Sequence, residues 1–395
     1  MRPARLVAFV VGTSVLSQTF VVDAANGPGT NFTSLPAAVA AVPDGAVLLV
    51  RPGSYAGFTA AQKGLVVLGE PGVTITDQLA FDDLGTSQSI VLRDLHFQGA
   101  VPGVYALISL TTCRGPVLLD HITNTPGCSN ATSCNPAVYA WRCAQLVVRD
   151  CTLRGPVQVG TNHGFRSATT FENCSLTGHS IPQVASPTPA LSIYDGTVQI
   201  VSSALTGGGG GPNPLFGPAN ESGIVANYTA DLRVLDSTIA SGTAATFGGW
   251  AVAATVGQAV FRIDPASVLT GLAGPTSGLT PQVGAMPHLL ATGAPPGGTL
   301  TATTATEDGD LVALAVGLPG PTTTTVPGIS DPFWFGMNTY FAHTIGVQQS
   351  GTPVSGAIAV PSATAFEGVE LVWHAVCYGA ATGLQNSNPA ISLIH

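Results

Sequence analysis

The sequence predicts an all-β protein in which a right-handed parallel β-helix is followed by a small C-terminal β-sandwich. The main observation is a recurring phrase: two short alternating apolar segments on either side of a polar corner. Successive corners are 26, 30, 23, 29 and 34 residues apart. One copy is too short to bury its own apolar side chains, whereas stacked copies bury a continuous core, as in a solenoid. The predicted corner residues are Asp94, Asp120, Asp150, Asn173, Ser202 and Asp236.

The composition is typical of many short strands joined by turns. Glycine (48) and proline (30) are abundant among the 395 residues, while 45% of residues are apolar and only 8% are charged. Lys63 is the only lysine and the formal net charge is −9. The clustered basic side chains that bind a nucleic-acid backbone are therefore missing, and we expect no nucleic-acid partner.

The N-terminus has the pattern of a secretory signal peptide. Two arginines precede an apolar run from Leu6 to Leu16, and small residues precede a cleavage position near Gln18. An N-terminal strand or a membrane anchor is the alternative, but a bilayer span needs roughly 20 apolar residues and no segment has them. We predict that residues 1–17 are a signal peptide and that the protein is secreted or lies on the cell surface, with no membrane span.

A short helix is expected to close the first coil. Ser34 can cap its N-terminus, Pro36 is tolerated in its first turn, and Leu35, Val39 and Val42 share one face. A solenoid must cover its exposed end, and this helix is placed to do so.

The opening segments also carry a resemblance to a known family. Val21-Val-Asp-Ala24, the stretch from Phe32 to Gly45, and Val50-Arg-Pro-Gly-Ser-Tyr55 are similar to the opening of pectinesterase- and pectate-lyase-like β-helix proteins. The resemblance implies the N-terminal cap and first coil of that fold. It also implies a superfamily that acts largely on acidic plant or microbial polysaccharides and includes uncharacterised surface proteins. The Gln-Asp-Thr-Leu and Asp-Phe-Ile-Phe-Gly phrases of the pectinesterases are missing.

The repeated phrase is lost after Asp264, which predicts a change of domain. We place the β-helix at 18–270, a Gly/Pro/Ser/Thr-rich linker at 271–284, and a β-sandwich of alternating strands at 285–395. The stretch Val369–Val376 resembles tail domains of large secreted bacterial β-helix proteins, a resemblance that names no activity.

The cysteines fall at equivalent positions of neighbouring copies. Equivalent positions on adjacent coils lie roughly 4.8 Å apart, close to the Cα separation that a disulfide accepts. The alternative is a stack of reduced, buried cysteines that behave as small apolar residues. Because export favours oxidation, we predict disulfides. The predicted pairs are Cys113–Cys143, Cys151–Cys174 and Cys128–Cys134, with Cys377 left free.

Four residues are candidates for contacting a polysaccharide: Asp83, His163, Arg166 and Glu172. Asp83 belongs to an adjacent carboxylate pair, Asp82-Asp83, which could serve acid–base chemistry. Neighbouring strand residues point to opposite faces, however, so a turn is favoured there. The phrase around His163 is similar to the middle motif of polygalacturonases alone, without its partner motifs. The alternative is a loop whose His and Arg pair with nearby carbonyls and carboxylates.

No cofactor or metal site is predicted. The column of corner aspartates could line up for a cation, but Asx side chains that hydrogen-bond the backbone of their own turns explain it more simply. The histidines lack the spacing of a metal motif, and no nucleotide-binding loop occurs.

Two classes of function remain. The favoured one is a non-catalytic, structural, adhesive or glycan-binding β-helix protein; the alternative is a polysaccharide-active enzyme of the lyase, esterase or hydrolase type. The fold hosts both, and a convergent set of acids, bases or cation ligands on neighbouring coils would distinguish them. No such set is recognisable among the charged residues. The sequence leaves the specific glycan and the oligomeric state open.

Overall fold

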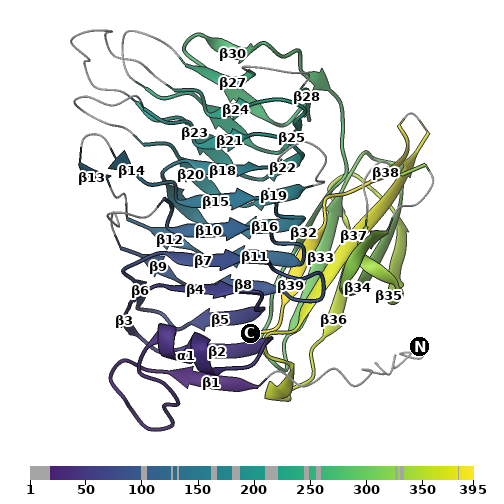
Figure 1. The fold of residues 1–395 in the computed structure, drawn as a ribbon. Helices are drawn as coiled ribbons and strands as arrows, with labels where there is room; N and C mark the ends of the chain where they lie inside the picture. The colour runs from purple at the N-terminus through teal and green to yellow at the C-terminus, as the bar shows by residue number, and fades with distance from the viewer. Residues whose placement is uncertain are drawn as a thin grey trace, which may run out of the picture.

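The computed structural model describes residues 18–98, 105–125, 128–130, 133–161, 167–179, 187–209, 221–243, 249–254, 259–324, 328–329, 333–380 and 382–395. The signal peptide predicted at 1–17 lies outside these residues. The chain forms a right-handed parallel β-helix with an antiparallel β domain packed along one of its sides (Figure 1). The predicted fold class is therefore confirmed.

Three parallel sheets form the walls of the solenoid. Sheet A contains β1 (Thr19–Val22), β2 (Ala46–Val50), β5 (Leu65–Gly69), β8 (Ile90–Arg93), β11 (Pro116–Asp120), β16 (Gln145–Arg149), β19 (Ala168–Glu172), β22 (Thr197–Val201), β25 (Asp231–Leu235), β28 (Val260–Ile263) and β31 (Gln282–Val283). Sheet B contains β3 (Gly53–Tyr55), β6 (Val73–Ile75), β9 (His96–Phe97), β12 (Thr123–Asn124), β17 (Thr152–Arg154), β20 (Ser175–Thr177), β23 (Ala204–Thr206), β26 (Thr238–Ala240) and β29 (Val268–Thr270). Sheet C contains β4 (Phe58–Ala61), β7 (Leu79–Asp82), β10 (Ile108–Thr111), β15 (Val138–Trp141), β18 (Val157–Gly160), β21 (Leu191–Ile193), β24 (Ile224–Ala226), β27 (Trp250–Ala254) and β30 (Gly274–Ser277).

The corner between sheets A and B is one residue in the left-handed backbone region, repeated coil after coil. Asp, Asn and Ser suit this position because their short polar side chains bond locally. One predicted corner is wrong: His121 occupies the left-handed position, while Asp120 is the last residue of β11 and pairs in register with Arg93 and Arg149. Asp120 is drawn into the strand because it forms ion pairs with those two arginines. The observed corners are Asp94, His121, Asp150, Asn173, Ser202 and Asp236.

A short helix closes the first coil, as predicted. Helix α1 (Leu35–Ala41) begins at Ser34, whose side chain accepts a hydrogen bond from the Ala37 backbone N–H. Its C-terminal end is anchored by Lys63, whose Nζ donates to the carbonyl oxygens of Val39 and Val42, both at 2.7 Å. The only lysine of the chain thus satisfies helix carbonyls that would otherwise lack partners.

The solenoid extends beyond the predicted boundary at residue 270. Residues 271–284 were expected to form a linker, but β30 pairs with β27 and β31 pairs with β28, both in parallel. The Gly/Pro-rich composition there reflects tight corners of a last coil, because strand pairing needs only backbone groups.

The C-terminal domain is a sandwich of two antiparallel sheets around its own core. Trp373 is fully buried between the sheets, among aliphatic side chains from both. One sheet contains β32 (His288–Ala291), β33 (Thr299–Ala305) and β36 (Val354–Ala359). The other contains β34 (Leu311–Thr324), β35 (Phe333–Val347), β37 (Glu370–Gly379), β38 (Gly383–Asn386) and β39 (Ala390–Leu393), and a 3-10 turn η1 (Thr364–Phe366) precedes β37.

This domain is packed against the outer face of sheet A (Figure 1). A second apolar cluster fills the contact, with aliphatic residues of the solenoid on one side and residues of β35, β37 and β39 on the other. Its fully buried members include Leu118, Val372, Ile391 and Leu393. Burial of this kind fixes the two parts relative to each other.

The cysteine pairs are adjacent, but the two inter-coil disulfides are not formed. The observed register places Cys113 beside Cys143 and Cys151 beside Cys174, yet all four are buried free thiols, as is Cys377. The Cys174 thiol lies 3.2 Å from the carbonyl oxygen of Val148 and 3.3 Å from that of Glu172, so it serves as a hydrogen-bond donor.

The third predicted pair lies in a hairpin. The backbone of Cys128 pairs with that of Cys134 where β13 (Cys128–Asn130) meets β14 (Ser133–Cys134). Their side chains are outside the described part of the chain, so that disulfide stays a prediction. In the described ranges, no helix combines the length and apolarity that crossing a bilayer requires.

Candidate functional site

Four aromatic side chains form a strip on the outer face of sheet C. Tyr139 and Trp141 alternate with buried residues along β15, and their rings are parallel to within 3° at a centroid distance of 6.1 Å. Tyr105 meets Tyr139 edge-on at 4.8 Å, and Tyr194 meets Trp141 at 5.9 Å. Tyr105 is 59% exposed. These residues, Tyr105, Tyr139, Trp141 and Tyr194, are called the aromatic strip below.

Neighbouring coils hold the strip in place. The Tyr105 hydroxyl donates a hydrogen bond of 2.9 Å to the side-chain oxygen of Gln158, which is the in-register partner of Tyr139 on the next coil. The Tyr105 side chain therefore crosses the coil of β15 and contacts the coil of β18. Burial raises the pKa of both Tyr105 and Tyr139, so both phenols are neutral hydrogen-bonding groups at physiological pH.

A glycine makes room for the other end of the strip. Gly160 follows Trp141 in the same column of sheet C. A Cβ atom at Gly160 would lie 2.6 Å from the Cβ of Tyr194 and 3.2 Å from Cζ3 of Trp141. The two rings meet because this position has no side chain. Thr111 and Asp82 continue the column in the other direction and add polar groups beside the rings.

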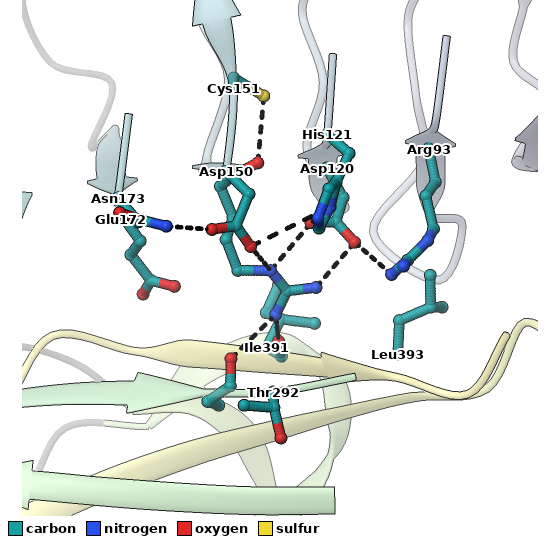
Figure 2. A network of polar contacts seen from close by, with 12 residues as sticks. Arg93, Asp120, His121, Asp150, Cys151, Glu172, Asn173, Thr292, Ile391 and Leu393 are labelled. Atoms are coloured by element: carbon teal, nitrogen blue, oxygen red, sulfur yellow. Dashed lines mark hydrogen bonds and ion pairs between the residues drawn. The ribbon is translucent and has the colours of Figure 1, made fainter. Parts of the chain in front are cut away.

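A second cluster, made of charged and polar side chains, lies where the C-terminal domain covers sheet A (Figure 2). The Asp120 carboxylate is fully buried and accepts hydrogen bonds from Arg93 at 2.6 Å and from Arg149 at 2.9 Å. Arg149 in turn donates to the carbonyl oxygens of Ile391 and Ala291 in the C-terminal domain. The network joins three coils to two strands of the sandwich, so its role is to hold the domains together.

The electrostatics of this network agree with that role. Burial alone would raise the pKa of Asp120, but the His121 hydrogen bond and the charges of Arg149 and Arg93 reverse the shift and hold the pKa below its ordinary value. Burial likewise opposes the charge on Arg149, and the Asp120 carboxylate outweighs it and raises the arginine pKa. Both groups stay charged because each compensates the other.

Glu172, one of the four candidate residues, belongs to this interface. It is 1% exposed, and its Oε1 accepts a hydrogen bond of 3.1 Å from the Asn388 side chain of the C-terminal domain, while Oε2 has no hydrogen-bond partner among the described residues. Burial raises the pKa of Glu172 to about 8. The carboxyl group is therefore neutral at pH 7 and lies under the sandwich, away from the open surface.

The other candidates lie elsewhere. Asp83 is an exposed corner residue after β7, with φ of 54°, and its N–H donates to the Thr111 carbonyl oxygen at 3.0 Å. This agrees with the turn interpretation. Asp83 lies at the corner that follows sheet C, whereas Glu172 is the last residue of β19 in sheet A, so the structure does not bring them together. His163 and Arg166 lie outside the described residues.

The described residues contain one group whose geometry resembles a metal site. Ligand atoms of Asp120, His121 and Asp150 lie within 4.8 Å of one another. The Asp120 carboxylate, however, is already bonded by Arg93, Arg149 and His121. Ion pairing between these side chains accounts for the cluster without a cation.

Sequence analysis missed the aromatic strip. Its members come from a segment before β10, from β15 and from the residue after β21, so no local motif connects them. The Tyr139-Ala-Trp141 spacing was the one available signal, because alternate residues of a strand share a face.

No protein-family model matches this chain, and no curated protein matches it in sequence. The class of protein therefore rests on the fold itself, a right-handed parallel β-helix with a β-sandwich packed on sheet A.

Proposed function

We propose that this chain is a secreted or cell-surface, non-catalytic protein that binds glycans across the outer face of sheet C. The observation that carries the proposal is the aromatic strip. Pyranose rings present apolar C–H faces and polar hydroxyl edges, so they suit a surface of aromatic rings bordered by hydrogen-bonding groups. Aromatic side chains supply large contact area at little entropic cost, and clustered exposed aromatics mark interaction sites.

The surroundings of the strip favour neutral sugars. Gln158 and Thr111 provide an amide and a hydroxyl, and Asp82 is the acidic group in the Trp141 column. The resemblance of residues 20–75 to pectate-lyase-like proteins supports a polysaccharide partner. The signal-peptide pattern at 1–17 supports export.

A polysaccharide-active enzyme is the competing proposal. Asp82 and Asp83 would then be its acids, close to the strip. Catalysis at a glycosidic bond requires two carboxyl groups facing one ligand about 5 to 10 Å apart. Asp82 faces outward from the strand, whereas Asp83 is held at the corner by its own backbone, so this pair lacks that arrangement.

The test combines a glycan array with assays for reducing ends and unsaturated products. We expect wild-type protein to bind one or more neutral glycans without turnover. Trp141→Ala should weaken binding about tenfold, because each stacked ring contributes about 1 to 2 kcal/mol.

The matched control is Tyr378→Ala, which removes a 57%-exposed tyrosine from the C-terminal domain. It should bind as the wild type does. Gly160→Ala provides a second variant that displaces the Trp141 and Tyr194 rings without deleting either. Equal binding by wild type and Trp141→Ala would overturn the assigned surface, and turnover abolished by Asp82→Asn would make the protein an enzyme.

A further inference from the structure

One strand at the border of the C-terminal domain is much longer than the others. β32 and β36 border one sheet of the sandwich, and β38 and β39 lie along one border of the other sheet. These four strands have four to six residues each, whereas β35, at the remaining border, has 15 (Figure 1). Within the described residues β35 pairs on one side only, with β34, so its other side is an open edge. A further strand can add to such an edge through backbone hydrogen bonds.

The residues of β35 do not protect this edge. Natural sheets block exposed edges with charged side chains, with proline or by keeping the strand short. The stretch Phe333–Val347 contains no Asp, Glu, Lys, Arg or Pro, and the sequence has no Lys or Arg after Arg262. A long edge strand of this composition is expected to pair with a strand of another chain.

Apolar side chains are exposed at the C-terminal end of β35. Ile345 is 67% exposed and Val347 is 52% exposed, and the two point to the same face because they are alternate residues of a strand. Leu311 of β34 is the in-register partner of Val347 and is 47% exposed. Single exposed apolar residues are normal, but adjoining ones mark interaction sites. We call Leu311, Ile345 and Val347 the apolar edge.

The apolar edge continues the surface that is buried between the domains. Phe335, near the start of β35, belongs to the apolar cluster that contacts sheet A. The ring of Tyr340 stacks on that of Phe335 at a centroid distance of 5.0 Å, with 15° between the planes. Tyr340, Ile345 and Val347 pair with β34 residues that share one face, so they lie on one face of β35. This face is covered by the solenoid at Phe335 and is open at Val347.

We propose that β35 pairs with β35 of a second copy of this chain, in an antiparallel and two-fold symmetric dimer. Antiparallel pairing of one strand with its own copy is an isologous contact, in which the same surface of each chain meets the other. It joins the two five-stranded sheets into one, gives hydrogen-bond partners to the backbone groups of both edges, and brings the two apolar edges together. A charged partner strand would instead have to bury its charges against these side chains, which is costly.

The test is sedimentation velocity of the full-length protein over a range of concentrations. We expect the wild type to be a dimer at micromolar concentration and Ile345→Lys to weaken dimerisation at least tenfold, because it places two like charges in the contact. Since Ile345 is exposed in the single chain, the variant should keep the circular dichroism spectrum of the wild type. Val283→Lys is the matched control: Val283 is also 67% exposed, on β31 of the last coil, and the variant should dimerise as the wild type does.

Hydrogen exchange identifies the strand that pairs. We expect the N–H groups of β35 to exchange more slowly in the wild-type dimer than in Ile345→Lys, while those of β16 in the solenoid exchange equally in both. The contact contains no charged side chain, so the dimer should persist in about 1 M NaCl. A monomeric wild type, an undiminished dimer of Ile345→Lys, dissociation by salt, or unchanged exchange of β35 would overturn the proposal. A monomeric Val283→Lys would also overturn it, because the interface would then lie at the open end of the solenoid.

Discussion

The two halves of one outer column of sheet A share a backbone geometry, but one half is covered and the other is open. In chain order this column contains Val47, Val66, Val91, Leu118, Val147, Thr170, Gln199, Arg233 and Arg262. In the first half, Leu118 and its aliphatic neighbours are sealed beneath the sandwich. In the second half, Arg233 and Arg262 occupy equivalent positions and line an open cleft. Parallel pairing repeats every coil regardless of side chain, so the side chains alone decide where the second domain can pack. The comparison teaches that a solenoid can hold a sealed docking face and an open polar face on the same sheet.

The largest expected effect comes from placing a charge in the sealed half. Leu118→Lys would bury an unpaired ammonium group in the apolar contact, and we expect a loss of about 3 to 5 kcal/mol in the free energy of unfolding or release of the sandwich from sheet A. Urea denaturation and limited proteolysis of the C-terminal domain measure the two effects.

The control for this variant is Gln282→Lys, at an exposed position near the open end of the same column. It should change stability by less than about 0.5 kcal/mol. Similar urea midpoints for the two variants would show that the two halves of the column do not differ as described.

Glu172 lies on β19, the strand where the outer column changes from aliphatic to polar. Its raised pKa predicts that the free energy of unfolding depends on pH. Its pKa is about 8 in the folded protein and near 4.5 as an ordinary glutamate. The folded state therefore binds more protons than the unfolded state between these values, so this group lowers stability as pH rises from about 4.5 to 8.

Glu172→Gln keeps the shape of the neutral carboxyl group and cannot ionise. We expect it to match the wild type near pH 4.5 and to be more stable at pH 8, by about 4 kcal/mol. The measurement is the difference between the two urea-unfolding free energies across this pH range, which removes contributions from other groups. A difference that does not vary with pH would mean that Glu172 is ionised in the folded state.

The sequence predicted those features that repeat and missed those that depend on contacts between distant segments. The coil phrase predicted the solenoid and the neighbouring cysteines, and a capping serine with apolar residues on one helical face predicted the capping helix; each follows from residues a fixed distance apart. The coil phrase was less successful at the corners. It misassigned Asp120, since the choice between Asp120 and His121 as corner depends on two arginines from other coils. Neither the packing of the sandwich on sheet A nor the aromatic strip has a local signature, and both required the coils to be stacked in register.

The smallest expected effect comes from the residues that directly follow the corners between sheets A and B. These residues point into the solenoid and stack in register as an inner column. Along the solenoid axis this column changes from apolar to polar residues, as the outer column of sheet A does. Cys174 and Ser203 are neighbours in it: the Cys174 N–H donates to the Ser203 hydroxyl at 2.9 Å, and Ser203 donates to the Val201 carbonyl at 2.7 Å. The column contains Leu95, Ile122, Cys151, Cys174, Ser203 and Ser237.

Cys174→Ser should therefore change the unfolding free energy by less than about 1 kcal/mol, because a hydroxyl makes the same contacts one coil further on. Cys174→Asp is the contrasting variant and should unfold far more easily, since it buries a charge at that position. Alkylation of denatured, unreduced wild-type protein should modify Cys151 and Cys174. Peptide mapping that instead finds them joined would restore the disulfide predicted from the register, and Cys174→Ser would then lose about 2 to 4 kcal/mol.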